Sequence, residues 1–525
     1  MEKKKVLVGL SWPYANSRLH IGNVASSLPA DAIARYHRMI GNRVSFVTGS
    51  DCYGTPITVR ASKEGLTPTE IAEKYHAHHA ADFKAFDFSF DNYDKTLSAR
   101  HHKFVREFHE QMYKGDMVYE KAAPQFYCDK CKKFLPDRYV EGICPHCKKA
   151  SKGDSCDSCG KILEPEELLS PKCITCNGTP VAKDQTQLYI KFSSMQKAIE
   201  KYYKERCDKW TTNAVGLTGR YLNEGLRDRA ITRSIEWGID VPKKGFEDKR
   251  IYIWAENVLG YLSASEPEFF SKQSKDNLHY YVHGKDNIPF HAIILPGLIM
   301  AHGGGYHLPD MIVANEYVTI CGDKISKSKG NFISAHTLHE NLDVDMVRYF
   351  FLRVMNDKRD TNFTAEDFVN TINGELVNNF GNLVNRTLSF VATKFDRVIP
   401  KSTNDKVVLG EIKNIKTQYN DLMMLGRTSL ALKVVMDLVN FGNKYFADNK
   451  PWTLVGDVPT ADLKKAQAVI GNVVSIILEC TVMLSPFIPR GTAKVLSWIG
   501  GDKLGDIEVL YQRLDLKDIK EKLKI

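Results

Sequence analysis

The chain has 525 residues, of which 43% are hydrophobic and 26% are charged, and its formal net charge is +9. The length suits roughly three domains of about 150 residues each, the composition is that of a soluble globular protein, and the positive charge mildly favours a polyanionic partner such as nucleic acid. A secretory signal and a membrane span are not expected, because the first apolar stretch covers only Val6 to Leu10 and the best later one, VVSIILECTVML, contains Glu479.

The first fifty residues predict a strand, a helix and a second strand. VLVGLS (6–11) and RVSFVTG (43–49) have the composition of buried strands, and between them Leu28, Ala32, Tyr36 and Ile40 recur at helical spacing before Gly41. Such a unit forms a right-handed crossover between parallel strands, which is how a doubly wound α/β fold begins.

From about residue 120 the composition changes to cysteines, glycines and lysines, as in small metal-stapled knuckles. Strand-like segments return at RIYIWAE, HYYVHGKD and MIVANEYVTI, which indicates that an inserted region splits the α/β sheet. After about residue 373 long stretches have helical periodicity, and we expect a helical bundle there.

Eight of the twelve cysteines form four CxxC pairs, which suits metal ligation in a reducing compartment, and we therefore expect a cytoplasmic protein. They supply enough thiolates for two four-cysteine zinc sites, which should be structural because no coordination position remains for water. Spacing alone leaves nested and sequential pairing open. The other four, Cys52, Cys207, Cys321 and Cys480, are interpreted as incidental thiols, and the histidines of KYHAHH and RHHKF as part of a wet helix face.

Two segments carry candidate phosphate chemistry. In SWPYANSRLHIGN, His20 and Gly22 stand at the start of the first helix, where backbone N–H groups and the helix dipole attract anions. In GDKISKSKGN, Lys324, Lys327 and Lys329 lie in a loop between two glycines, which suits closure over a triphosphate.

HIGN and KISKS resemble the two signature motifs of class I aminoacyl-tRNA synthetases. PYANSRLHIGN, GSDCYGTPI, the CxxC insertion, IYIWAENVLGYLSA, HGKDNIPFH and NLVNR narrow the resemblance to the methionyl-tRNA synthetase family over nearly the whole chain. The resemblance implies a Rossmann-type parallel sheet split by a zinc-knuckle insertion and followed by an α-helical anticodon-binding bundle. The implied boundaries are 1–119 and 231–325 for the two halves of the catalytic domain, 120–230 for the insertion, 326–372 for the signature loop and stem-contact region, and 373–525 for the anticodon-binding domain.

The resemblance also implies roles for individual residues. The implied catalytic residues are His20, Lys324 and Lys327, and the ATP site adds Gly22, Asn23, Lys285 and Asp286, where Asn23 replaces the commoner histidine of the signature. The implied methionine pocket consists of Trp12, Tyr14, Asp51, Trp254, Val258, Tyr261 and His291; Asp51 would hold the ammonium group, and aromatic edges suit a thioether. The implied anticodon readers are Asn382, Arg386 and Trp452. A nested zinc arrangement is favoured, with Cys144, Cys147, Cys156 and Cys159 forming the inner site and Cys128, Cys131, Cys173 and Cys176 the outer.

The implied reaction is the ATP- and Mg²⁺-dependent joining of methionine to tRNA(Met), by a chain that we expect to be monomeric and to have no membrane partner. Two alternatives stay open. One is a class I synthetase for leucine, isoleucine, valine or cysteine, although no large editing insertion fits the sequence. The other is a non-catalytic RNA-binding paralogue.

Overall fold

The structure is a computed structural model that describes residues 3–525 except 136–138, 154–155, 157, 162, 273–275, 327–329, 404, 457–458 and 502. Contacts divide the chain into two compact units. Unit 1 comprises residues 1–18, 42–81 and 90–315, and unit 2 comprises residues 19–41, 82–89 and 316–525.

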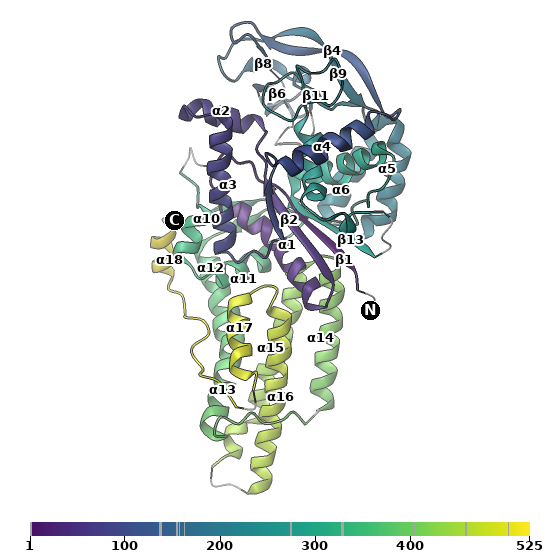
Figure 1. Ribbon diagram of the computed structural model, residues 1–525. Coiled ribbons are helices and arrows are strands. Elements are labelled where there is room, and N and C mark those ends of the chain that lie inside the picture. Colours follow the sequence, from purple (N-terminus) through teal and green to yellow (C-terminus); the bar gives the residue numbers. More distant parts are fainter. Residues whose placement is uncertain are drawn as a thin grey trace. The chain divides into compact units, whose positions relative to one another are not determined.

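Unit 1 is built on a five-stranded sheet in the order β14-β13-β1-β2-β3, in which every neighbouring pair is parallel (Figure 1). Its strands are β1 (Lys5–Leu10), β2 (Arg43–Ser50), β3 (Asn92–Lys95), β13 (Asn277–Gly284) and β14 (Met311–Asn315). The first seven residues of β13 are buried, as expected for a central parallel strand. The strand order reverses between β1 and β13, and such a switch point is where open α/β sheets bind ligands.

The helices of unit 1 are distributed among these strands. They are α2 (Thr55–Glu64), α4 (Ala99–Met112), α5 (Phe192–Arg206), α6 (Thr212–Glu224), α7 (Ile253–Glu256), α8 (Gly260–Ser263) and α9 (Leu295–His302), and α3 (Pro68–Ala85) continues into unit 2 at residue 82. Side chains from the sheet, α4 and the 253–264 segment form one hydrophobic core, which includes Leu7, Val47, Phe108 and Val258.

The insertion interrupts the sheet between β3 and β13, as the sequence predicted. A long antiparallel ribbon carries it, formed by β4 (Val118–Cys128) and β9 (Val181–Ile190) with β5 (Lys133–Phe134) and β10 (Arg229–Ala230) at the edges. A small second sheet consists of β6 (Val140–Ile143), β7 (Ala150–Lys152) and β8 (Leu169–Cys173). The insertion has only a small core of its own, to which four cysteines contribute together with Leu135, Val140, Leu163 and Leu168.

RIYIWAE differs from its prediction as a strand of the main sheet. Only Arg250–Ile251 forms a strand, β12, and it pairs with β11 (Thr232–Arg233) outside that sheet. The chain then turns into helix at Ile253. The run of aromatic and β-branched residues has high strand propensity, but packing of the following residues into the unit 1 core overrides that local preference.

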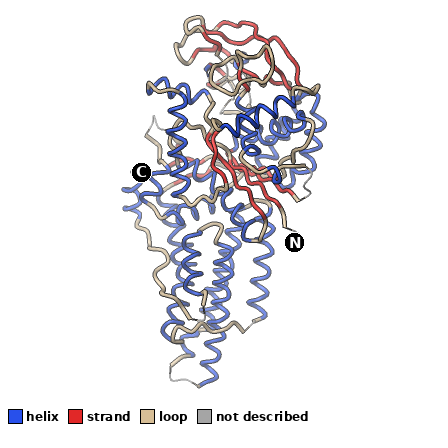
Figure 2. The backbone as a smooth tube through the Cα atoms, in the orientation of Figure 1, coloured by secondary structure: helices blue, strands red, loops and turns tan. Residues whose placement is uncertain are grey.

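The first helix of unit 2 is α1 (Ile21–Met39), and Ile40 is its C-cap residue. Gly41, which follows, has a left-handed backbone conformation, so the helix stops where the sequence predicted. A three-stranded sheet follows, with β15 (Val318–Ile320) between β16 (Asp323–Lys324) and β17 (Thr361–Phe363). The remaining helices are α10 (Ala335–Asn341), α11 (Val344–Val354), α12 (Ala365–Thr371), α13 (Asn382–Lys394), α14 (Lys406–Met424), α15 (Thr428–Asn449), α16 (Thr460–Leu484), α17 (Pro489–Ile499) and α18 (Leu516–Leu523). Figure 2 shows this part of the chain as almost entirely helical, and a π-helical stretch, Ile372–Gly381, joins α12 to α13.

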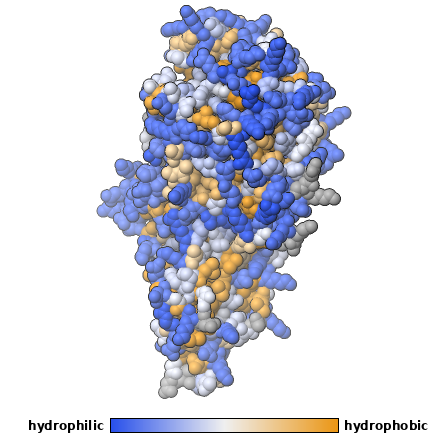
Figure 3. Space-filling model, viewed as in Figure 1, coloured by the Kyte–Doolittle hydropathy of each residue, from blue (hydrophilic) through white to orange (hydrophobic). Residues whose placement is uncertain are grey.

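Helix α16 is longer and more apolar than the sequence analysis expected. Among the helices in the described ranges, it alone is long and apolar enough to cross a membrane by length and composition, but 67% of its most apolar window is buried inside the protein. Glu479 lies in this helix and pairs with Lys416 (2.9 Å). Polar side chains cover most of the face in Figure 3, and apolar groups gather mainly over the helices of unit 2.

Candidate active site

A group of aromatic side chains in unit 1 lies just beyond the carboxyl ends of β1, β2 and β13. Trp12 follows β1 and meets the ring of Tyr261 edge-on, with the ring centroids 6.4 Å apart. Glycines make this approach possible: a Cβ at Gly49 would lie 2.6 Å from Trp12 and one at Gly260 2.8 Å from it. At Gly9 a Cβ would lie 2.7 Å from Tyr261. Gly9, Gly49 and Gly260 therefore leave room for the large rings of Trp12 and Tyr261, which form a close-packed aromatic wall.

Tyr261 is joined to His291 by a hydrogen bond of 2.7 Å between the phenol oxygen and Nε2. The other ring nitrogen of His291 lies 2.8 Å from the carbonyl oxygen of Asn287, to which it must donate. Burial lowers the pKa of His291 to about 4, so the ring is neutral at pH 7. A neutral ring that donates through Nδ1 can only accept at Nε2, so the phenol of Tyr261 donates to it.

Trp254 stacks on Phe290, with the ring centroids 3.6 Å apart and the planes 11° from parallel. The segment that carries Trp254, Val258 and Tyr261 is helical, and a 3-10 turn at Asn257–Leu259 separates α7 from α8. Val258 is fully buried, whereas Trp254 is half-buried. Phe290 was not singled out from the sequence, although it stands directly before His291 in HGKDNIPFH.

Asp51 stands at the end of β2 and is 2% exposed. Its backbone pairs with the loop after β1, since its N–H donates to the Pro13 carbonyl oxygen (2.9 Å) and its carbonyl oxygen accepts from Ala15 (2.8 Å). These two hydrogen bonds make Tyr14 and Asp51 a single pair of parallel, strand-like residues. The two strand ends therefore hold Tyr14 and Asp51 beside each other.

A second carboxyl group of this region, that of Glu256, is also buried. Burial raises the pKa of Glu256 well above its usual range, which favours the protonated form of this carboxyl group. Its Oε2 lies 3.4 Å from Nε2 of His101, whose pKa is lowered by burial to about 4. Glu256 and His101 thus meet in a buried contact, and sequence reasoning did not identify either residue as part of the site. RHHKF, which contains His101, was interpreted as part of a solvent-exposed helix face, but His101 is fully buried.

Lys285 and Asp286 lie in a 3-10 turn, Lys285–Asn287, directly after the central strand β13. They are thus at the same edge of the sheet as Trp12 and Asp51, which follow β1 and β2. Ligands of open parallel sheets bind at this edge, and Lys285 and Asp286 were expected in the ATP site only because the family resemblance implies it.

In unit 2, His20 is the N-cap residue of α1. Its Nδ1 accepts from the backbone N–H of Gly22 (3.1 Å), and the side-chain oxygen of Asn23 accepts from the backbone N–H of His20 (3.0 Å). An Nδ1 that accepts leaves the imidazole proton on Nε2, and the Asn23 amide nitrogen remains a donor. A Cβ at Gly22 would lie 3.1 Å from both the His20 ring and Ile325.

The lysine loop is attached to the same helix start. Lys324 is exposed in β16, and the loop after it is closed by a hydrogen bond from Ser326 N–H to the Asn331 carbonyl oxygen (2.8 Å). Beyond the loop, Ile21 N–H donates to the Ile333 carbonyl oxygen and Ala335 N–H donates to that of Leu19, both at 2.9 Å. The ring of Phe332 meets His20 edge-on at 5.8 Å. Lys327 and Lys329 lie outside the described residues.

The eight CxxC thiols form two groups of four, and within each group the sulfur atoms all lie within 4.8 Å of one another. One group contains Cys128, Cys131, Cys173 and Cys176, and the other contains Cys144, Cys147, Cys156 and Cys159, which is the grouping that a nested pair of sites requires. Individual sulfur–sulfur distances are 3.4–3.9 Å, and none of these cysteines is in a disulfide. Zn–S bonds of about 2.3 Å place tetrahedral thiolates about 3.8 Å apart, so both groups fit zinc.

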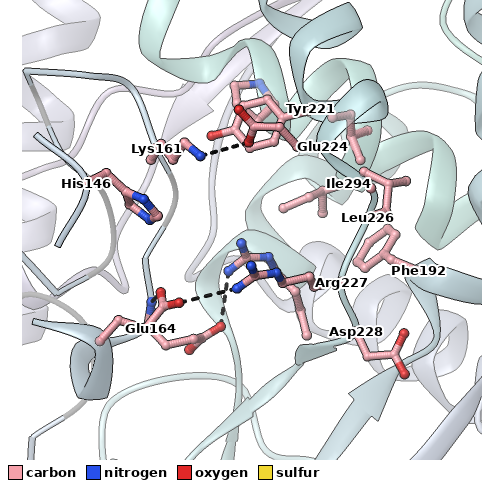
Figure 4. Close-up of a pocket in the computed structure, with 15 residues that line it drawn as sticks. His146, Lys161, Glu164, Phe192, Tyr221, Glu224, Leu226, Arg227, Asp228 and Ile294 are labelled. Atoms are coloured by element: carbon pink, nitrogen blue, oxygen red, sulfur yellow. Dashed lines mark hydrogen bonds and ion pairs between the residues drawn. The ribbon is translucent and has the colours of Figure 1, made fainter. Parts of the chain in front are cut away.

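A cavity of about 180 Å³ lies in unit 1 between the inner cysteine group and α6 (Figure 4). Its charged side chains are paired with each other: Lys161 with Glu224 at 2.9 Å, and Arg229 with Glu164 at 3.1 Å. Beside it, the hydroxyl of Tyr221 donates to the Gly160 carbonyl oxygen, next to Cys159 (2.8 Å). These contacts dock the cysteine knuckle against α6, and we interpret the cavity as part of that joint.

The three residues proposed from the helical region lie in unit 2. Asn382 is exposed at the start of α13. The Arg386 guanidinium lies 4.2 Å above the ring of Phe446, which in turn lies 5.8 Å from the Trp452 ring, at 30°. Trp452 itself is 49% exposed. Arg386 and Trp452 are therefore linked through Phe446, which was not identified from the sequence.

Comparison with known proteins assigns the family. Residues 6–388 match the family described as tRNA synthetases class I (M). The chain belongs to the class I tRNA synthetases. This class I synthetase is 40% identical over 539 residues to methionine–tRNA ligase 1 of Alkaliphilus oremlandii (strain OhILAs), with 99% of each chain covered. It is 37% identical over 543 residues to the methionine–tRNA ligase of Bacillus mycoides (strain KBAB4), covering 99% of this chain and 98% of the relative.

The synthetase fold is also found among solved structures. Mycobacterium tuberculosis methionyl-tRNA synthetase in complex with methionyl-adenylate superposes with a TM-score of 0.81 at 23% identity, covering 98% of this chain and 100% of that one. The predicted fold, a parallel α/β sheet split by a cysteine-knuckle insertion and followed by helices, is therefore confirmed.

Proposed function

We propose that this class I synthetase is a methionine–tRNA ligase, which activates methionine with ATP and transfers it to the terminal adenosine of tRNA(Met). The observation that carries the choice of amino acid is the pocket edge of unit 1, where the buried carboxyl group of Asp51 lies beside an apolar aromatic wall. Asp51 is buried, and the nearby His291 ring is neutral at pH 7 because burial lowers its pKa to about 4.

A substrate with one ammonium group and an apolar thioether chain suits this arrangement. Asp51 would bind the ammonium group, and Trp12, Tyr14, Trp254, Val258, Tyr261 and His291 would surround the side chain. Thioether sulfur is attracted to aromatic edges, and the neutral Tyr261–His291 pair brings no second charge into the pocket. A larger or charged side chain would have to disrupt this pair.

In the first step, the methionine carboxylate attacks the α-phosphorus of ATP and pyrophosphate leaves. His20 Nε2–H, the Gly22 and Asn23 amides and the lysines of the loop, Lys324 and Lys327, would stabilise charge on the phosphates, and Lys285 and Asp286 would contact the nucleotide. Mg²⁺ bound to ATP would neutralise the leaving group. Backbone hydrogen bonds between residues 19–21 and 333–335 support this assignment, because they bring the two signature segments together in unit 2.

In the second step, the terminal adenosine hydroxyl of tRNA attacks the methionyl-adenylate carbonyl carbon, and AMP leaves. Asn382, Arg386 and Trp452 would read the anticodon, since exposed aromatic rings and arginine planes stack on unpaired bases. The contacts of Phe446 with Arg386 on one side and Trp452 on the other support this role. The exposed Trp452 ring could stack on a base, and the Arg386 guanidinium adds a positive charge to the same row of side chains.

The remaining assignments are also proposals. Zinc would fill both cysteine groups and would be structural, since four thiolates complete a tetrahedral site. The chain would act in the cytoplasm as a monomer, without a membrane partner. The proposed domain segments of the chain are 1–119, 120–230, 231–325, 326–372 and 373–525.

The decisive experiment is amino-acid-dependent exchange of labelled pyrophosphate into ATP, with the common amino acids supplied singly. We expect strong exchange with methionine alone. Asp51→Asn should raise the KM for methionine by about a hundredfold, since removing one charge from a buried charge-assisted contact costs about 2 to 3 kcal/mol. Asp240→Asn, which changes an exposed carboxylate of the same unit, should leave the KM unchanged.

Each other outcome has a defined meaning. Exchange with leucine, isoleucine, valine or cysteine would retain the class I chemistry but replace the substrate. Absence of exchange with any amino acid, combined with retained tRNA binding, would overturn the proposal in favour of a non-catalytic RNA-binding paralogue.

A further inference from the structure

A cluster of two histidines and one aspartate in unit 2 lies apart from both cysteine groups. Asp82 stands in the last turn of α3, and His336 and His339 are three residues apart in α10. One ligand atom from each of the three side chains lies within 4.8 Å of the others. We propose that Asp82, His336 and His339 form a third metal site, which binds a divalent transition-metal cation that prefers imidazole ligands, such as Zn²⁺ or Ni²⁺.

The spacing between the best-defined pair suits two ligands of one ion. Nε2 of His339 lies 3.3 Å from Oδ1 of Asp82. A direct bond between a charged imidazole and a carboxylate is normally about 2.7 to 2.9 Å long. Metal bonds of about 2.0 to 2.2 Å place neighbouring ligand atoms about 2.8 to 3.1 Å apart in octahedral geometry and about 3.3 to 3.6 Å apart in tetrahedral geometry, and the observed distance agrees with the latter.

The second nitrogen of His339 is oriented as in protein metal sites. Nδ1 lies 3.3 Å from Oε1 of Glu340, and a carboxylate at the far nitrogen fixes the ring and raises the basicity of the ligating one. The ring of Phe86 meets His339 edge-on, with centroids 5.7 Å apart. Nε2 is thus held toward the buried carboxylate of Asp82.

The three side chains differ in their exposure to solvent, which suits an ion whose open coordination positions face the solvent. Asp82 is 2% exposed, His339 is half-buried and His336 is exposed. Two imidazoles and one carboxylate leave positions for water on the solvent side, and this donor set favours first-row transition metals over Mg²⁺ or Ca²⁺. A bound ion would join the end of α3 to α10, the helix that follows the lysine loop.

The competing explanation is an imidazolium ring of His339 held between Asp82 and Glu340 without an ion. That arrangement accounts for His339, but it assigns no function to His336, whose ring lies 5.0 Å from that of His339 at 80°. The two explanations therefore differ in whether His336 contributes, which makes His336 the informative position.

The test uses untagged full-length protein in which both cysteine groups are already filled with zinc. Equilibrium dialysis against Ni²⁺, with metal counted by mass spectrometry, should give one further ion per chain. With Co²⁺ as the probe, the added ion should have the weak visible absorption of nitrogen and oxygen ligation, without a thiolate charge-transfer band.

Variants separate the two explanations. His336→Ala, at an exposed position, should abolish the additional ion while leaving the unfolding midpoint of the zinc-loaded protein unchanged. Glu340→Gln should weaken Ni²⁺ binding by about tenfold, as loss of a carboxylate behind a ligating histidine does. His302→Ala, a half-buried histidine of unit 1 outside the three groups, should retain the ion. Equal Ni²⁺ binding by the wild type and His336→Ala would overturn the proposal.

Discussion

Arg348 and Asp31 form an ion pair of 2.6 Å inside unit 2, and neither side chain is exposed to solvent. Arg348 lies in α11 and Asp31 in α1, the helix that begins at the HIGN signature. Burial alone would raise the pKa of Asp31, but Arg348, Arg35 and two hydrogen bonds from Ser89 outweigh it and hold the pKa below its usual value. Carbonyl oxygens of Phe86, Pro486 and Phe487 each accept a further hydrogen bond from Arg348.

The first prediction concerns this pair. Asp31→Asn should reduce the free energy of unfolding by about 3 to 5 kcal/mol, because it leaves a buried guanidinium without its counter-charge. Urea denaturation at pH 7 measures this loss. As the control, Lys416→Gln removes a surface pair with Glu479 and should cost less than about 1 kcal/mol. Because the folded pKa of Asp31 is lowered, the advantage of the wild type should persist above about pH 4 and disappear as the pH falls below it. Equal losses in the two variants would contradict this account.

The second prediction concerns the hydrogen bond from Tyr261 to His291. Tyr261→Phe leaves the aromatic wall in place but removes the donor to Nε2, so it should raise the KM for methionine by about five- to tenfold, as loss of about 1 kcal/mol implies. The KM for ATP should not change. Steady-state pyrophosphate exchange measures both constants, and Tyr306→Phe, a half-buried tyrosine elsewhere in unit 1, serves as the control. A parallel rise in both KM values would indicate a general disturbance of the fold.

The third prediction follows from three buried histidines of unit 1. Burial lowers the pKa of His101, His109 and His291 to about 4, whereas a histidine in an unfolded chain titrates near 6.5. The unfolded state therefore binds more protons between these values, and stability should fall as the pH is lowered from about 6.5 to 4. Urea midpoints measured across this range test the trend. His101→Gln should have a shallower slope than the wild type, and a midpoint independent of pH would refute the assignment of neutral rings.

The fourth prediction concerns the cysteine groups. The purified protein should contain two zinc ions bound to thiolates, and Cys147→Ser and Cys176→Ser should each remove a different one. Cys321→Ser changes an exposed thiol outside both groups and should retain both ions. Metal analysis together with thiol titration provides the measurement, since thiolates bound to zinc react slowly. A wild-type content well below two thiolate-bound ions per chain would overturn the assignment.

The fifth prediction concerns Trp452. Trp452→Ala should raise the KM for tRNA by about five- to a hundredfold, because stacking of one base on an aromatic ring contributes about 1 to 3 kcal/mol. Adenylate formation should be unchanged. Leu430→Ala, which truncates another exposed apolar side chain of unit 2, is the matched control. Loss of adenylate formation along with tRNA charging would instead indicate that Trp452 supports folding.

The sequence predicted the elements whose local pattern agrees with their final environment. The strand at 6–11 was found at Lys5–Leu10 and the strand at 43–49 at Arg43–Ser50, because both are short, apolar and buried on two faces. RIYIWAE was predicted incorrectly because its strand-forming composition conflicts with its packing. The π-helical turns at Ile372–Gly381 could not be predicted, since they differ from α-helix by hydrogen-bond register and not by composition.

The candidate site was predictable where a role follows from residue type and position. Asp51 after a strand and His20 before a helix are such cases, and the paired cysteines are another. Long-range relationships were not predictable: Phe290 against Trp254, Phe446 between Arg386 and Trp452, and Asp82 beside a histidine more than 250 residues later in the chain. These contacts depend on how distant segments fold together, and no local pattern records that.

The joint between residues 19–21 and 333–335 is made by main-chain N–H and carbonyl groups. Nearly every amino acid can supply such groups, so the side chains at these positions can be exchanged without removing the hydrogen bonds. Proline is the exception, because it has no N–H to donate. Proline at Ile21 or at Ala335 would therefore remove one of these two hydrogen bonds, and proline at both positions would remove both. The double substitution offers a way to loosen the joint between the two signature segments while the proposed phosphate-binding groups are kept.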